Sequence, residues 1–164
     1  MKIIIVTGTP GSGKTTLSKK LSKKLDFYYL DVNLVISKYN LSEGFDRKRK
    51  TKIIDVNKLN KKLILEIKNI KKIEKYNGIV IDSHLSHYLP KKYADFCIVT
   101  KCDIKELNKR LKKKGFHQPK IRENLDAEIF DVCYSEAKRR KHNIIVVGTA
   151  KGFNMDDLIQ KMGM

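Results

Sequence analysis

The residues best suited to chemistry lie near the start of the sequence, where glycines, a lysine and hydroxyl residues are interleaved. They match the pattern GxxxxGK[ST], in which glycines let the backbone curl so tightly that successive N–H groups point at phosphate oxygens. The lysine of this pattern reaches the β- and γ-phosphates, and the hydroxyl after it offers an oxygen to Mg²⁺. The segment therefore predicts a loop that binds ATP and Mg²⁺, formed by Gly8, Gly11, Ser12, Gly13, Lys14, Thr15 and Thr16.

A second candidate set follows the apolar run that ends at Asp82. A carboxylate at the end of a buried strand can join Thr15 in the Mg²⁺ shell, although it could also cap an ordinary turn. His84 lies two residues further, on the same edge, where it could orient or deprotonate a water or hydroxyl. A purely structural role for His84 is equally open, and His87, in the turn before Pro90, is a weaker candidate.

A third pattern, Thr100-Lys101-Cys102-Asp103, imitates the base-reading [NT]KxD motif of GTPases. A GTPase would also show Asp-x-x-Gly after the apolar strand, whereas Ser83, His84 and Leu85 follow Asp82 here. Asp103 has a sufficient role as the N-cap of a helix, in a capping box with Glu106. We therefore reject the GTPase interpretation.

The elements that must position these residues alternate along the chain. Apolar runs predict strands at 2–7, 27–30, 78–82, 95–100 and 143–147, whereas 31–54 is less regular. Apolar residues at helical spacing predict a helix after Lys14, one over 56–74 and one that ends at Gly115. They also predict a helix from Pro119 through Leu125, Ile129 and Cys133, and a last helix that begins near Asn154. This order predicts one α/β domain over residues 1–164, with a five-stranded parallel sheet flanked by helices and a ligand at the carboxyl ends of the strands.

The composition is that of a globular protein with an unusual charge. The 164 residues carry a formal net charge of +18, which suits binding to nucleotides, RNA or a ribonucleoprotein surface. An AT-rich genome, whose codons favour lysine, explains the charge equally well. No apolar run approaches the roughly 20 residues needed to span a bilayer, and no cleavage site follows the first strand, so we expect a cytoplasmic protein. Cys97, Cys102 and Cys133 form no CxxC pair, and we expect reduced thiols.

Several segments together resemble the adenylate kinase isoenzyme six family of small archaeal and nuclear kinases. They are the GTPGSGKTT loop, Asp82-Ser83-His84, Arg110-Leu111 running into Lys114-Gly115-Phe116, and the stretch from Lys120 to Phe130 that contains ENLxAEIF. The resemblance implies a broad-specificity nucleoside monophosphate (NMP) kinase that also hydrolyses ATP. It further implies a role in late maturation of the small ribosomal subunit, with ribosomal protein uS11 and pre-ribosomal RNA as partners.

The same resemblance assigns two segments near the site. Residues 31–54 would bind the monophosphate, AMP for example, and residues 113–123 would form a short lid that brings Lys114 onto the ATP phosphates. Relatives often carry arginine at the position of Lys114, and lysine lacks the bidentate fork of arginine. Ser37 also stands where some relatives have arginine, and Lys38 or the Arg47/Arg49 run could substitute, unless that run is only a solvated face. A small-metabolite kinase of the shikimate type is the alternative function.

Overall fold

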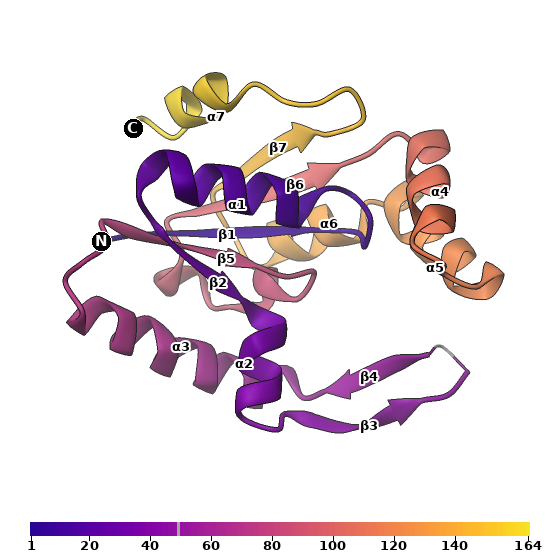
Figure 1. Ribbon diagram of the computed structural model, residues 1–164, viewed down its shortest axis with the longest axis horizontal. Helices are drawn as coiled ribbons and strands as arrows, with labels where there is room; N and C mark the ends of the chain where they lie inside the picture. The colour runs from indigo at the N-terminus through magenta and orange to yellow at the C-terminus, as the bar shows by residue number, and fades with distance from the viewer. Residues whose placement is uncertain (49) are drawn as a thin grey trace.

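The computed structural model describes residues 1–48 and 50–164, and it is built around a five-stranded parallel sheet (Figure 1). The strands are arranged in the order β2-β5-β1-β6-β7. Their bounds are β1 (Lys2–Gly8), β2 (Tyr28–Asp31), β5 (Gly78–Asp82), β6 (Phe96–Lys101) and β7 (Ile144–Gly148). The predicted fold class and its five strands are confirmed, and each strand lies within about one residue of its expected bounds.

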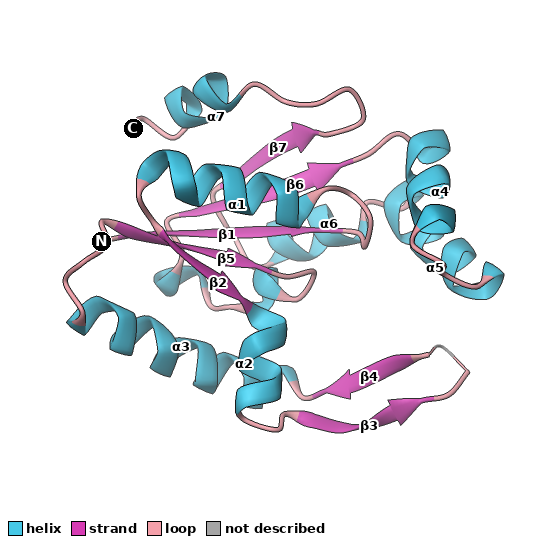
Figure 2. Cartoon of the chain, in the orientation of Figure 1, coloured by secondary structure: helices cyan, strands magenta, loops and turns pink. Residues whose placement is uncertain are grey.

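Helices cover both faces of the sheet (Figure 2). Along β1, Ile3 and Ile5 face a core cluster shared with α3, whereas Ile4 and Val6 face a second cluster shared with α1. This alternation is the two-residue period of a strand buried on both sides. The helices are α1 (Lys14–Leu25), α2 (Val32–Lys38), α3 (Val56–Lys72), α4 (Ile104–Lys113), α5 (Gln118–Ile129), α6 (Val132–Arg139) and α7 (Met155–Lys161), with short 3-10 turns η1 (Ser86–Tyr88) and η2 (Lys91–Tyr93).

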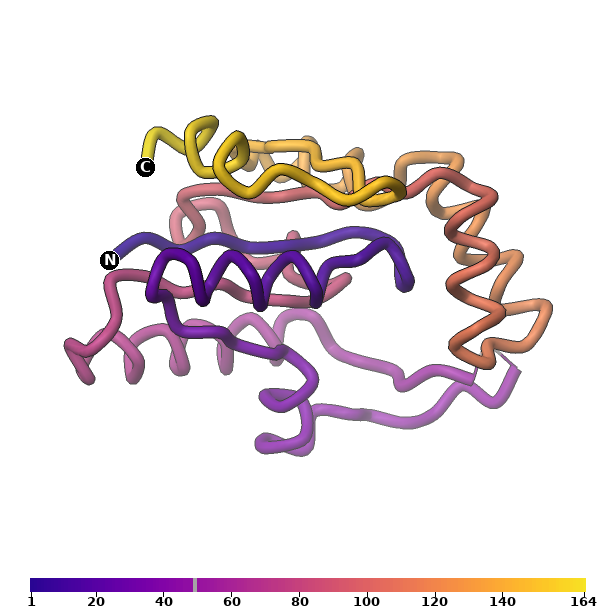
Figure 3. The backbone as a smooth tube through the Cα atoms, turned by 45° about the horizontal axis from the view of Figure 1, so that its top comes forward, coloured from indigo at the N-terminus to yellow at the C-terminus, as the bar shows by residue number. Residues whose placement is uncertain are grey.

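Two projections extend beyond the carboxyl ends of the strands (Figures 1 and 3). One is an antiparallel hairpin of β3 (Ser42–Asp46) and β4 (Thr51–Ile54), inside the segment that the sequence left irregular. The other is the pair α4 and α5, which packs on its own small core of Leu107, Leu111 and Ile121. The nucleotide motif lies between these projections and the end of the sheet.

The helix expected from Pro119 through Cys133 is wrong in its continuity, because the chain breaks into α5 and α6 at Asp131. Asp131 has the left-handed φ of 52°, which interrupts the helical bonds. Ile129 and Val132 fall within the expected helix, yet they are 55% and 44% exposed. The apolar spacing in the sequence therefore continues across the turn between α5 and α6, although apolar residues on both sides of that turn are exposed.

The capping box predicted at Asp103 forms only in part. The Asp103 carboxylate accepts hydrogen bonds from the N–H groups of Lys105 and Glu106, as an N-cap should. The Glu106 side chain turns outward instead and pairs with Arg110 at 3.0 Å. Gly115 follows the end of α4 with a φ of 76°, the conformation that favours glycine after a helix. The three cysteines are free, as expected.

The start of β5 leaves no room for a side chain larger than hydrogen. A Cβ on Gly78 would lie 2.3 Å from the Phe27 ring, which is itself nearly buried. We predict that Gly78→Ala lowers the free energy of unfolding by about 1–3 kcal/mol, because the ring can move only by disturbing the core. Urea denaturation measures this change.

The matched control is Gly44→Ala, since a Cβ there meets only Ile53 Cδ1, at 3.7 Å. That variant should stay within about 0.5 kcal/mol of the wild type. Equal stability of the Gly78→Ala variant would show that the Phe27 ring is not held in place.

Candidate nucleotide-binding site

The phosphate-binding loop leaves β1 at Gly8 and enters α1 at Lys14, the strand-to-helix setting that the motif requires. Gly8, Gly11 and Gly13 have φ values of 147°, 87° and 92°, all positive and accessible to glycine without strain. A Cβ on Gly8 would also lie 2.2 Å from the Thr100 hydroxyl. The loop can therefore close over the end of β6 only because these positions are glycine.

Buried hydroxyls support the loop from below. Ser12 and Thr100 share a hydrogen bond of 2.6 Å between their hydroxyls, and the Thr149 hydroxyl donates to the Ser12 carbonyl at 2.6 Å. Both Ser12 and Thr100 are fully buried. The Ser12 side chain, predicted as part of the phosphate cradle, thus packs underneath it. Its contribution to ATP would come through its backbone N–H.

The ammonium of Lys14 lies at the centre of the loop and donates to the Thr9 carbonyl at 3.0 Å. Burial lowers the pKa of Lys14 to about 8, since removal from water disfavours a charge, and nearby Asp82 opposes the shift while Lys114 adds to it. At neutral pH most Lys14 side chains still carry the charge that a triphosphate needs. Because Lys14 is partly buried, that charge interacts more strongly with phosphate than it would in water.

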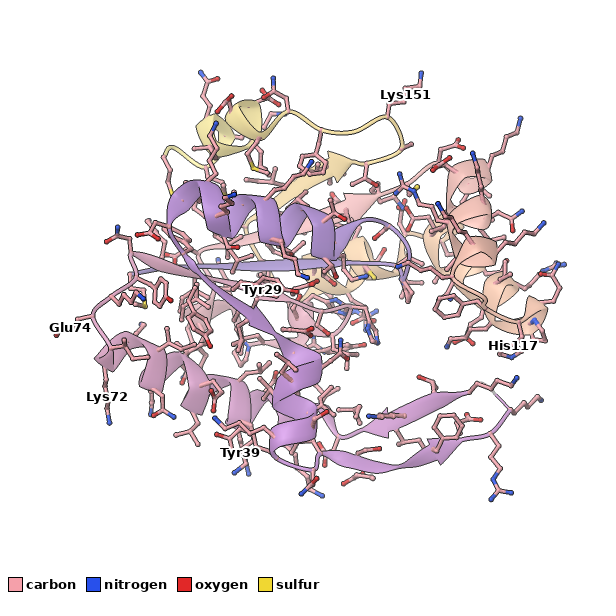
Figure 4. All side chains as sticks on the ribbon, in the orientation of Figure 1. Tyr29, Tyr39, Lys72, Glu74, His117 and Lys151 are labelled. Carbon is pink, nitrogen blue, oxygen red and sulfur yellow. The ribbon has the colours of Figure 1, made fainter. Side chains whose placement is uncertain are left out.

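Asp82 ends β5 with its carboxylate almost buried, and Tyr29, the second residue of β2, donates a hydrogen bond to it at 2.9 Å. Figure 4 shows Tyr29 beneath α1, on whose first turn Thr15 is exposed. The Thr15 hydroxyl and the Asp82 carboxylate are hard oxygen donors, the kind that Mg²⁺ prefers, and phosphates of a bound nucleotide would supply further oxygens. Within the described residues no cluster of three or more His, Cys, Asp or Glu could hold a metal unaided.

A cavity of about 640 Å³ opens beside the loop, at the carboxyl ends of the strands where a ligand was expected. It is large enough for a nucleotide, and it runs from the loop to the segment after β7. Its lining includes Gly11, Gly13, Lys14, Thr15, Thr16, Lys20, Arg110, Lys113, Lys114, Thr149, Ala150, Gly152 and Phe153. Lys114, predicted as a lid cation, therefore lines the same cavity as the loop, exposed at the end of α4.

Sequence reasoning missed the part of the cavity wall that Arg110, Thr149 and Phe153 form. Arg110 pairs with Glu106 and donates to the Thr149 carbonyl at 2.9 Å, which fixes its guanidinium against the segment 149–153. Arg110 stood in the sequence one helical turn before Lys114, a spacing that places both on one helix face. Thr149 and Phe153 carried no such signal, because they enter the site only through the path of the chain after β7.

His84 lies in the turn after β5 and is exposed, and it is not among the residues that line the cavity beside the loop. Surrounding protein atoms and the charges of Lys14 and Lys120 lower the pKa of His84 to about 4. Because the pKa of His84 lies below 7, its ring is neutral at pH 7 and can accept a proton or hold a water.

His87, the weaker candidate, packs into the body of the protein. Its Nδ1 lies 2.7 Å from the Thr7 hydroxyl, and its carbonyl pairs with Nε2 of His142 at 3.0 Å. The side chain is only 3% exposed. These contacts fit a structural role behind the phosphate loop.

The expected monophosphate segment, 31–54, comprises α2 and the β3–β4 hairpin. Ser37 and Arg47 are exposed, and Lys38 pairs with Glu66 at 2.8 Å, so its ammonium is already engaged outside the nucleotide cavity. Arg49 lies outside the described residues. Lys101, from the pattern that imitates a GTPase, pairs with Glu128 and Asp131 instead of facing a base.

Comparison with known proteins agrees with this geometry. The family model for an AAA domain matches residues 4–131. A solved deoxyadenosine kinase from M. mycoides with bound dATP covers 100% of both chains with a TM-score of 0.60 and 18% identity. Shikimate kinase from Acinetobacter baumannii covers 99% of this chain and 90% of its own, with a TM-score of 0.61 and 15% identity. At these identities the likeness concerns the fold alone. The fold and the site together are those of a P-loop kinase.

Sequence relatives identify the family more closely. An adenylate kinase isoenzyme 6 homologue from Dictyostelium discoideum is 33% identical over 144 residues, which cover 88% of this chain and 78% of its own. The Saccharomyces cerevisiae homologue, FAP7, is 34% identical over 145 residues, covering 88% and 70%. A Methanocaldococcus jannaschii protein provisionally named an adenylate kinase is 36% identical over 157 residues, covering 96% and 84%. The chain belongs to the adenylate kinase isoenzyme 6 family. Among the described residues, no helix has the length and apolar character to cross a membrane.

The buried histidine pair makes stability depend on pH. Burial lowers the pKa of His87 to about 3 and also lowers the pKa of His142. Unfolded histidine titrates near 6.5, so between about pH 6.5 and 3 the unfolded chain binds protons that the folded chain does not, and stability falls as the pH falls. Stability from this source is complete above pH 6.5.

We predict that His87→Gln flattens this acid limb by about 1 kcal/mol per pH unit between pH 6 and 4. Denaturation midpoints of variant and wild type at pH 7, 6, 5 and 4 measure the slope. Parallel curves for the two proteins would mean that His87 takes up its proton in the folded state.

Proposed function

We propose that this protein is a broad-specificity NMP kinase that transfers the γ-phosphoryl group of ATP to a monophosphate such as AMP, and that it also hydrolyses ATP. The observation that carries the proposal is the loop with its desolvated Lys14, which opens onto a nucleotide-sized cavity shared with Lys114. Membership of an adenylate kinase family supports the monophosphate as acceptor.

The chemistry would consist mostly of positioning and charge neutralisation. The loop N–H groups and Lys14 would hold the β- and γ-phosphates, and Lys114 would add positive charge where the transferred group develops negative charge. An acceptor phosphate oxygen then forms a bond to γ-phosphorus as the bond to the bridging oxygen of ADP breaks. Bound through Thr15 and Asp82, Mg²⁺ would neutralise the phosphate charge.

The acceptor would bind between the β3–β4 hairpin and α4–α5. Figure 4 shows His117 at the end of the α4–α5 projection that faces this hairpin. Two projections on either side of one loop suit a reaction between two nucleotides, because closure of either excludes water.

ATP hydrolysis could also serve the assembly of the small ribosomal subunit in the cytoplasm. The net charge of +18 favours an anionic surface, and uS11 with pre-ribosomal RNA are the partners that the family resemblance implies. Hydrolysis stimulated by uS11 or ribosomal RNA, measured against AMP phosphorylation, distinguishes this second function.

A single assay tests the proposal against a kinase of the shikimate type. ATP turnover is measured without acceptor, with each NMP, with shikimate and with uS11, on wild type and Lys14→Ala. We predict AMP-dependent ADP formation by the wild type and a loss of at least about a hundredfold in the variant for both reactions, since one lysine serves the phosphates in each.

Circular dichroism confirms that the Lys14→Ala variant is folded. Turnover of that variant near the wild-type rate would contradict the assignment of the loop. ADP formation with shikimate but with no NMP would replace the proposed acceptor.

A substitution at His84 should separate the two reactions. Water is a weak nucleophile that must be held in line, so we predict that His84→Gln lowers acceptor-free ATP hydrolysis by about tenfold to a thousandfold. An NMP phosphate oxygen is already anionic, so AMP phosphorylation should fall by much less. Both rates are measured on one preparation. Equal losses would make His84 a shared or structural residue, and no loss in either rate would remove it from the mechanism.

A further inference from the structure

The ENLxAEIF stretch contains a carboxylate that the reaction described above does not use. Glu128 lies in the last turn of α5, and its residue is only 5% exposed. Burying an ionised carboxylate is costly unless it is paired and hydrogen-bonded. Its partners therefore indicate what this carboxylate is placed to do.

The two oxygens of Glu128 reach different parts of the site. Oε2 accepts a hydrogen bond of 2.6 Å from the Thr9 hydroxyl, inside the phosphate loop. Oε1 accepts from the N–H of Cys102 at 2.9 Å and lies 3.1 Å from the Lys101 ammonium, both just past the end of β6. Lys101 also donates to the Glu128 carbonyl and pairs with Asp131. One side chain thus joins α5 to the loop and to the sheet.

Thr9, the loop residue that Glu128 holds, makes two further contacts within the loop. The Thr9 carbonyl accepts a hydrogen bond of 3.0 Å from the Ser12 N–H, which closes the turn, and another of 3.0 Å from the Lys14 ammonium. Thr9 is itself 1% exposed. A shift of Thr9 would therefore move both the turn and the lysine that faces the phosphates.

The position of Glu128 in the chain adds a second consequence. The proposed lid, 113–123, overlaps the first half of α5, and Glu128 lies in the last turn of that helix. A hydrogen bond to a charged group is roughly twice as strong as one between neutral groups, so it can fix a short loop relative to a helix. The Thr9–Glu128 bond thus ties the lid helix to the phosphate loop.

We propose that Glu128 is a positioning residue for phosphoryl transfer: it clamps Thr9 to α5, and through Thr9 it sets the shape of the loop and the position of Lys14. This inference rests on the proposed kinase function. It assigns a mechanistic role to a glutamate that touches no substrate.

Thr9→Val is the principal test, because it keeps the shape of the side chain and removes the hydroxyl. Phosphorylation of AMP by ATP is measured for kcat and for the KM of ATP, beside the Kd of Mg²⁺-free ADP by calorimetry. We expect kcat to fall about tenfold or more and ADP affinity to fall about threefold to tenfold. Thr9→Ser, which restores the hydroxyl, should return both values to within about twofold of the wild type.

Two further variants separate the clamp from general stability. Glu128→Gln weakens the bond by removing its charge, so kcat should fall severalfold, and Thr9→Val should cost less in that background than in the wild type. Asp131→Asn is the matched control, since Asp131 also pairs with Lys101 and asparagine tolerates the φ of 52°. It should leave kcat within about twofold.

The outcomes are distinct. A Thr9→Val variant with wild-type kcat and ADP affinity would overturn the clamp, whatever its melting temperature, and so would a Thr9→Ser variant as impaired as Thr9→Val. If the wild type phosphorylates no NMP, the proposed function fails. The ADP affinities of the same variants would then still decide whether Glu128 shapes the loop.

Discussion

The close approach of Gly8 to Thr100 is the contact on which the rest of the site depends. β6 runs beside β1 from Ile4 to Gly8, and where the chain leaves β1 at Gly8 only a residue without a side chain can turn. That turn aims the backbone of the loop toward the cavity and delivers Lys14 to the start of α1. The pairing of β1 with β6 thus shapes the phosphate-binding loop and also builds the core.

Around this contact the site is held mainly by polar groups that water does not reach. Thr100, Ser12 and Thr149 are all buried, and their hydroxyls bond to one another or to the backbone. Hydrogen bonds in such surroundings are costly to leave unmade, so each group restricts the next. A loop of five residues between β1 and α1 can in this way hold one shape before any ligand arrives.

The sequence was sufficient for the sheet and the loop because their signals are local. Buried parallel strands are continuous apolar runs, and the loop is a fixed pattern of residue types. The β3–β4 hairpin was missed because its strands have no buried residue and lack the alternation of a half-buried sheet. The break at Asp131, like the roles of Thr149 and Glu128, depends on contacts between distant parts of the chain, which periodicity along one helix cannot report.

The depressed pKa of Lys14 has a consequence for how nucleotide binding exchanges protons with solvent. With a pKa of about 8, about one molecule in ten carries an uncharged Lys14 at pH 7, and a larger share does so in mildly alkaline solution. A polyphosphate beside the amine favours its charged form, so occupancy of the site draws in a fraction of a proton. The heat of association therefore contains a contribution from the buffer that supplies that proton.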